Sequence, residues 1–165
     1  MSNKKPKWNP ATHKTRTVET VYECPVEKLY PLFCPVREFE YMRNWTCTMR
    51  FSESGYAEKN AIFQSGYPFP PGMKATWVCT NYEKNKSLTY TIFIPNTVII
   101  VLEHKFEKLN DNKTTHIVAI SGFGLNWLGR IMLKKMFSKA DDKDGWRDEM
   151  TKELVYFLKY GKKIG

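Results

Sequence analysis

Long apolar runs are missing from this sequence. No stretch approaches the roughly 18 consecutive apolar residues of a membrane-spanning helix. The amino terminus, MSNKKPKWNP, is basic and polar, and it lacks the apolar core of a secretory signal peptide. These absences predict a soluble protein that stays in the cytoplasm.

Signatures of catalysis and of metal binding are also missing. The four cysteines (Cys24, Cys34, Cys47 and Cys79) form no Cys-x-x-Cys pair, and neither a Gly-x-Ser-x-Gly nor a His-Glu-x-x-His motif occurs. A reducing cytoplasm keeps such thiols free, so we expect them to be small buried side chains. We therefore expect no metal and no cofactor, and no catalytic residue is assigned.

Acidic residues are in the minority. The chain has 26 Lys and Arg against 17 Asp and Glu, a formal net charge of +9. This excess favours encounters with anionic surfaces, including membranes and nucleic acid. The basic residues are spread along the chain without a recognition helix or an aromatic RNA-binding strand, so nucleic acid is not a predicted partner.

One segment combines basic with apolar side chains. Residues 122–139, GFGLNWLGRIMLKKMFSK, place Trp127 and Ile131 among Arg130, Lys134 and Lys135. This composition is typical of segments that lie at an anionic membrane surface. We expect the segment to be partly exposed near the entrance of a cavity. The alternative is burial of the segment in the core or in an oligomer interface. The sequence does not decide whether the protein forms an oligomer.

Hydrophobic residues, by contrast, are plentiful. They make up 42% of the 165 residues, and aromatic residues make up 15%. A chain of this size is long enough to bury one substantial core. We predict a flexible basic tail at residues 1–13 and a single domain at 14–165.

The pattern of apolar residues predicts the order of the elements. Residues 14–23 alternate as a strand does, and each Cys-Pro-Val, at 24–26 and 34–36, starts a short helix. Val36, Phe39 and Met42 form the apolar stripe of the second helix.

Strands and a final helix fill the rest of the chain. Six strand candidates lie between residues 45 and 124, and their short connections predict an antiparallel meander in which WTCTMRF points Phe51 inward. An amphipathic helix follows, with Trp146, Met150, Leu154 and Phe157 on one face. The preceding segment also has a helical pattern. The sequence leaves open whether KADDKDG (139–145) breaks the two into separate helices.

This order of elements resembles the START-like superfamily, also called the Bet v 1-like or polyketide cyclase and lipid-transport group (SRPBCC). The segments PVEKLYPLFCPVREFEYMRNW, GYAEKNAIF, TWVCTNYE and the terminal YFLKYG carry the resemblance, and EFEY at 38–41 is similar to an EYEW-like run in a subgroup of small, uncharacterised bacterial proteins. The resemblance implies an α+β helix-grip fold, in which a curved antiparallel sheet of about seven strands wraps a long C-terminal helix and two short helices follow the first strand.

The resemblance also implies a hydrophobic cavity between sheet and helix. The alternation of the strands identifies the residues that would line it, with Trp127 added from the basic segment: Trp45, Met49, Phe63, Trp77, Tyr90, Ile92, Ile100, Leu102, His104 and Trp127. The facing of His116 is open, because its strand is apolar on both sides. The YPFPPG loop and the second helix are expected near the mouth, and a fully packed core is the alternative to a cavity.

Two functions fit these expectations. The first is binding or transport of a hydrophobic small molecule, lipid-like or polycyclic, without catalysis, with His104 or Tyr90 orienting the ligand. The second is a cyclase, dehydratase or hydrolase-like enzyme that acts on such a ligand in the same cavity. His104 or Glu103 would then serve as general acid or base.

Overall fold

The computed structural model describes residues 10–66, 72–138 and 146–165. Most of the predicted basic tail, most of the YPFPPG loop and the KADDKDG segment lie outside the described residues. The first strand starts at Thr12, two residues before the predicted start at Lys14.

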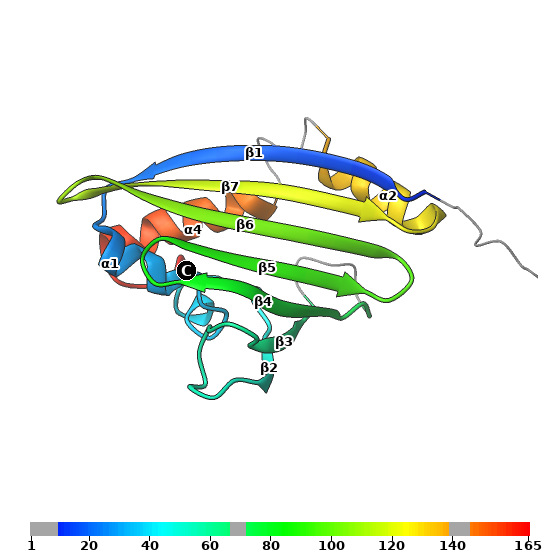
Figure 1. The fold of residues 1–165 in the computed structure, drawn as a ribbon. Coiled ribbons are helices and arrows are strands. Elements are labelled where there is room, and N and C mark those ends of the chain that lie inside the picture. Colours follow the sequence, from blue (N-terminus) through cyan, green and yellow to red (C-terminus); the bar gives the residue numbers. More distant parts are fainter. Residues whose placement is uncertain (1–9, 67–71, 139–145) are drawn as a thin grey trace, which may run out of the picture.

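In the described part of the chain, a single antiparallel sheet of seven strands forms the body of the protein (Figure 1). The strands are β1 (Thr12–Tyr22), β2 (Thr48–Phe51), β3 (Ile62–Ser65), β4 (Ala75–Glu83), β5 (Ser87–Ile94), β6 (Val98–Asn110) and β7 (Lys113–Gly124). Strands β2 to β7 follow one another across the sheet, and β1 pairs with β7 at the far edge. The predicted antiparallel meander is confirmed.

Short helical turns connect β1 to β2. They are α1 (Val26–Leu29) and the 3-10 turns η1 (Tyr30–Phe33) and η2 (Glu38–Glu40). Pro25 stands directly before α1, and its carbonyl oxygen accepts hydrogen bonds from Lys28 and Leu29, as a helix start requires. The first Cys-Pro-Val copy is therefore a helix start, as predicted.

The second copy leads into a single 3-10 turn. Pro35 is followed by η2, in which Phe39 is 41% exposed while Glu38 is only 8% exposed. The predicted stripe of Val36, Phe39 and Met42 is therefore wrong at Phe39. Glu38 and Met42 point inward instead, four residues apart, and the N–H of Met42 donates to the backbone oxygen of Glu38 over 2.9 Å, as in one turn of α-helix.

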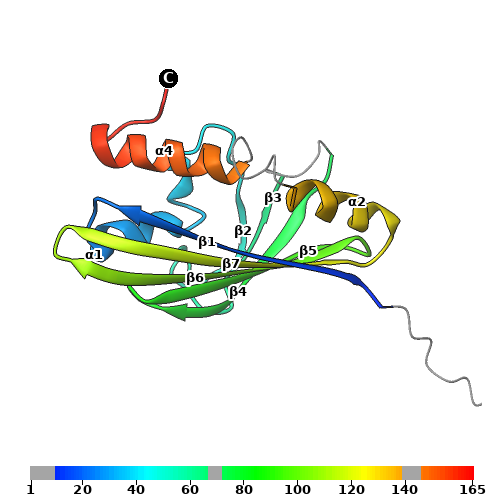
Figure 2. The ribbon, with the colours of Figure 1, turned by 90° about the horizontal axis from the view of Figure 1, so that it is seen from above.

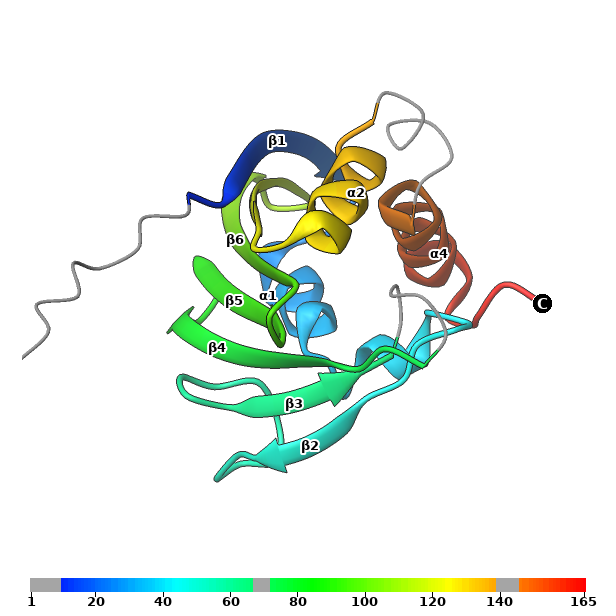
Figure 3. The ribbon, with the colours of Figure 1, turned by 90° about the vertical axis from the view of Figure 1, so that its right-hand side faces the viewer.

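The sheet curves around the helices. Figure 3 shows the strands passing in an arc from β1 to β2, with the helices on the concave side. Helix α2 (Trp127–Met136) and helix α4 (Trp146–Tyr160) lie on the same face of the sheet, toward opposite ends of it (Figure 2). Sheet and helices together form the predicted helix-grip fold.

Inward side chains of the strands and of α4 form one hydrophobic core. Phe63, Ile92, Ile100 and Leu154 are 2% exposed or less. At the edge, however, the register of β2 against β3 shifts between Met49 and Phe51. This shift turns Phe51 outward, where it is 51% exposed, and corrects the prediction that it faces the core.

Within the described ranges, no helix is both long enough and apolar enough to cross a membrane.

Candidate functional site

A small cavity lies in the middle of the concave face, between the sheet, η2 and the first turns of α4. Its free volume is about 40 Å³, which is room for at most a few water molecules. The lining residues come from strands, loops and helices: Tyr22, Phe33, Glu38, Met42, Trp45, Trp77, Tyr90, Leu102, His104, His116, Val118, Arg147, Met150 and Thr151. The cavity is thus apolar on most sides, with titratable groups among the rings.

Two buried histidines form the floor of the cavity. In the register of β6 and β7, His104 stands opposite Val118 and His116 opposite Phe106, which makes the imidazoles diagonal neighbours on one face. Nδ1 of His104 lies 3.0 Å from Nε2 of His116, and the rings stack with an interplanar angle of 8°. One ring donates this hydrogen bond and the other accepts it.

Both imidazoles are neutral at pH 7. Burial, and then the positive charge of Arg147, lower the pKa of His104 to about 3. Burial, His104 and Arg147 hold the pKa of His116 well below its usual range. Protonating either ring would place an uncompensated charge among apolar side chains.

Glu38 brings a carboxyl group into the same cavity. Its side chain is buried, and no hydrogen bond to its carboxyl is found within residues 10–66, 72–138 and 146–165. Burial alone raises the pKa of Glu38 to about 8. At neutral pH the group is therefore mostly a protonated acid, which both donates and accepts hydrogen bonds.

The first turns of α4 close the cavity from above. Arg147, Met150 and Thr151 line it from this helix, because residues three and four apart share one helical face. Thr151 is hydrogen-bonded to Tyr22. Burial raises the pKa of Tyr22, so its hydroxyl is neutral and stays in this bond.

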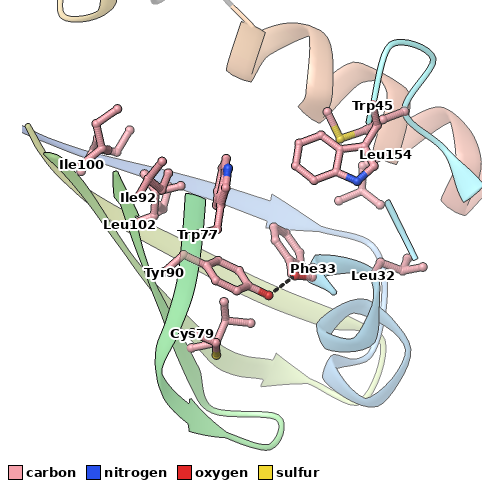
Figure 4. Close-up of a cluster of buried hydrophobic side chains, with 14 of the residues drawn as sticks. Leu32, Phe33, Trp45, Trp77, Cys79, Tyr90, Ile92, Ile100, Leu102 and Leu154 are labelled. Atoms are coloured by element: carbon pink, nitrogen blue, oxygen red, sulfur yellow. Dashed lines mark hydrogen bonds between the residues drawn. The ribbon is translucent and has the colours of Figure 1, made fainter. Parts of the chain in front are cut away.

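Aromatic side chains make the walls. Figure 4 shows Trp77 rising from the sheet on the side of Trp45, and Tyr90 pointing toward Phe33. The Tyr90 hydroxyl donates to the backbone oxygen of Phe33 over 3.0 Å, and the indole of Trp45 donates to the oxygen of Pro35 over 2.7 Å. These bonds satisfy the polar ends of the rings and leave their apolar surfaces toward the cavity. The Tyr90 hydroxyl thus uses its proton on the backbone, while its oxygen can still accept a hydrogen bond.

An ion pair at the margin joins the η2 segment to α4. Nε of Arg43 lies 2.6 Å from Oε1 of Glu153, whose side chain is 4% exposed. Arg43 also approaches Glu149, at 3.3 Å, and Lys163 donates to the oxygen of Met42. Glu38 precedes Arg43 by only five residues. These contacts therefore hold the segment that carries the Glu38 carboxyl against α4.

The predicted ligand-binding residues divide into three groups. Five of them line the cavity: Trp45, Trp77, Tyr90, Leu102 and His104. Three are buried in the core outside its lining: Phe63, Ile92 and Ile100.

The remaining two lie away from the cavity. Met49 packs against the core in part. Trp127 is 71% exposed on α2, and no described residue of that helix lines the cavity. Glu103, the alternative acid, is exposed because odd-numbered positions of this part of β6 face outward.

Several lining residues escaped prediction, although some had a signal in the sequence. His116 follows from the register once the turn at 111–112 is fixed, and Arg147 and Thr151 share a helical face with Met150. For Glu38 the sequence carried no signal, because an acidic residue in a short polar segment normally faces water.

The sequence matches no protein-family model and no curated protein. The fold, however, is shared by solved structures at low identity. SA2116 from Staphylococcus aureus, a protein of unknown function, aligns with a TM-score of 0.67 at 12% identity over 92% of this chain and 96% of its own. CalU16 from Micromonospora echinospora aligns with a TM-score of 0.56 at 12% identity over 92% of this chain and 84% of its own. Ara h 8.0201 aligns with a TM-score of 0.61 at 11% identity over 89% of this chain and 98% of its own. The chain thus shares its helix-grip fold with these solved structures.

Proposed function

We propose that this protein binds a small, mainly apolar molecule that carries a hydrogen-bonding group, in the cavity beneath α4. One observation supports this proposal most: Glu38 lines the cavity with its side chain buried, and no hydrogen bond to its carboxyl is found among the described residues. A buried polar group without a partner costs a protein roughly 1–3 kcal/mol. A ligand that supplies the missing bond recovers this cost.

Each part of the lining has a role in binding. The rings of Trp45, Trp77 and Tyr90 remove the apolar part of the ligand from water. Glu38, protonated near neutral pH, donates to a carbonyl or hydroxyl oxygen of the ligand. The neutral His104 and His116 select against a cationic ligand, because they offer it no countercharge.

The cavity has to widen to admit such a ligand. A volume of about 40 Å³ is smaller than one aromatic ring needs. The covering elements are α4 and the η2 segment, which Arg43 and Glu153 join across the margin. We infer that a ligand enters when these two elements separate, and that a lipid-sized ligand requires a larger separation than a single ring does.

Calorimetric titration with para-bromophenol and para-bromotoluene tests the proposal. The two molecules have nearly the same shape, and only the first carries a hydroxyl group. We expect the protein to prefer the phenol, and Glu38→Met, which removes both donor and acceptor, to weaken phenol binding about tenfold, the loss of one hydrogen bond. Glu40→Met, at an acid paired with Arg37 two residues along, is the matched control and should bind as the unmodified protein does. Equal affinities for both molecules, or no binding of either, would contradict the proposal.

Acid–base catalysis in the same cavity is the second candidate. The observation that favours it is a carboxyl with a pKa of about 8 lining one cavity with two hydrogen-bonded imidazoles. A group that titrates near neutral pH suits general acid–base work. Such an enzyme would be a cyclase, dehydratase or hydrolase-like protein acting on the bound molecule. His104→Ala would abolish its turnover, whereas in a carrier the same change would only weaken binding.

A further inference from the structure

The outer face of α2 carries apolar side chains in water. Trp127 is 71% exposed and Ile131 is 57% exposed, one helical turn apart on the same face. Leu125, just before the helix, is 39% exposed. The opposite face is buried through Gly129 and Leu133, so these outward residues are not needed for packing.

Cations surround this apolar face. Arg130, Lys134 and Lys135 are exposed, and the ten residues of α2 include no acidic side chain. In a helix of 3.6 residues per turn, Lys134 follows Trp127 and Ile131 along their own face, while Arg130 and Lys135 flank it on either side. On β1, Lys14 stands opposite Gly122, over which α2 packs, so it adds a further cation beside the helix.

The helix is held rigidly on the sheet. A Cβ atom on Gly124 would lie 2.9 Å from the backbone of Gly129, and one on Gly129 would collide with the carbonyl oxygen of Thr97. The side chain of Asn126 accepts from the N–H of Gly129 over 2.8 Å and donates to the oxygen of Asn96 over 2.7 Å. The exposed face is thus fixed in position before any partner arrives.

We propose that this face of α2 docks on a membrane surface that contains anionic lipids. Tryptophan favours the boundary between headgroups and acyl chains, where its ring is apolar and its N–H stays hydrated. Ile131 and Leu125 enter the same layer, and the flanking cations meet the lipid phosphates. Charge complementarity selects this partner over a second copy of the chain, whose α2 face would bring the same positive charges together.

Co-sedimentation with vesicles of phosphatidylcholine containing phosphatidylserine tests this docking. We expect the purified protein to bind these vesicles, to bind pure phosphatidylcholine vesicles more weakly, and to lose affinity as salt is added. The triple variant Arg130→Glu, Lys134→Glu, Lys135→Glu should weaken binding at least about tenfold. Trp127→Ser with Ile131→Ser should weaken it comparably without changing the charge.

A second triple variant controls for net charge. Lys59→Glu, Lys84→Glu, Lys86→Glu changes the charge by the same amount at exposed positions away from α2. We expect this control to retain most of the binding. Equal losses in the two triple variants, or equal binding to both vesicle types, would overturn the proposal. It would also fail if the protein ignored vesicles and formed dimers that Trp127→Ser abolished, because the face would then serve a second copy.

Discussion

The two long helices on the concave face meet the sheet in different ways. Helix α2 reaches the sheet where β7 presents Gly122 and Gly124, so that its own Gly129 touches backbone. Helix α4 lies over positions where the sheet presents His104 and His116, and it reaches them through long side chains such as Arg147 and Met150. Glycines let one helix close onto the sheet, whereas large side chains hold the other away and leave a cavity.

This difference separates the two proposed activities in space. The closely packed end supplies a rigid outer face with Trp127 and basic residues. The loosely packed end supplies an internal site with Glu38 and the histidine pair. Changes at one end should leave the other largely intact, because sites far apart act independently.

The largest expected effect comes from breaking the close contact of α2. In Gly129→Ala, the new methyl group meets the carbonyl oxygen of Thr97, and the helix has to move off the sheet. We expect the free energy of unfolding, measured with urea, to fall by about 3 kcal/mol. Lys135→Ala, at an exposed position of the same helix, is the control and should have little effect. An unchanged unfolding free energy in Gly129→Ala would show that α2 is not seated by backbone contact.

At the cavity end, Glu38 should govern how stability depends on pH. Its pKa rises from 4.5 to about 8 on folding, so the folded state holds the proton more tightly and loses stability as pH rises toward 8. His104, lowered from 6.5 to about 3, and His116 act in the opposite sense, since stability is lost as pH falls below 6.5. Together the three groups place maximal stability near pH 6.5.

Glu38→Gln removes the alkaline side of this profile. Between pH 6.5 and 8 the unmodified protein should lose about 2 kcal/mol that the variant keeps, measured by urea unfolding at each pH. Glu40→Gln should follow the unmodified protein, because the guanidinium of Arg37 lowers the pKa of that carboxyl and it is ionised throughout this range. Parallel profiles for Glu38→Gln and the unmodified protein would mean that Glu38 is not buried as described.

The smallest effect is expected at the margin of the cavity. Arg43→Met removes the cation that joins the η2 segment to Glu153. Amide hydrogens of α4 should then exchange faster than before, while those of β6 and β7 keep their rates. Arg37→Met is the matched control, because Arg37 pairs with Glu40 in its own segment and should leave the exchange of α4 unchanged.

The sequence predicted the sheet and the inward-facing positions of its central strands. Strict alternation in β4 to β6 placed Trp77, Tyr90, Leu102 and His104 on the inner face, because a strand has only two faces to choose between. The cavity formed by these residues is much smaller than a lipid requires, since the bulky rings themselves fill most of the space.

Other parts of the site depend on tertiary contacts. Glu38 is buried because the segment that carries it lies against α4, where Arg43 contacts Glu153, and a single acidic residue in a short segment carries no sign of this. Trp127 was predicted in the cavity from its apolar character, yet α2 turns it outward because the glycines occupy the inner side. Local pattern fixes the face of a strand, but it does not fix which face of a short, mixed segment meets the sheet.

A crystal structure of the protein soaked with para-bromophenol tests the central proposal most directly, because bromine can be located by its anomalous scattering. We predict a bromine peak among Trp77, Tyr90 and Met150, with the hydroxyl oxygen within hydrogen-bonding distance of the Glu38 carboxyl and α4 displaced outward. Bromine found only on the outer surface, with the lining unchanged and Glu38 still without a partner, would contradict the proposal that this cavity binds a small molecule.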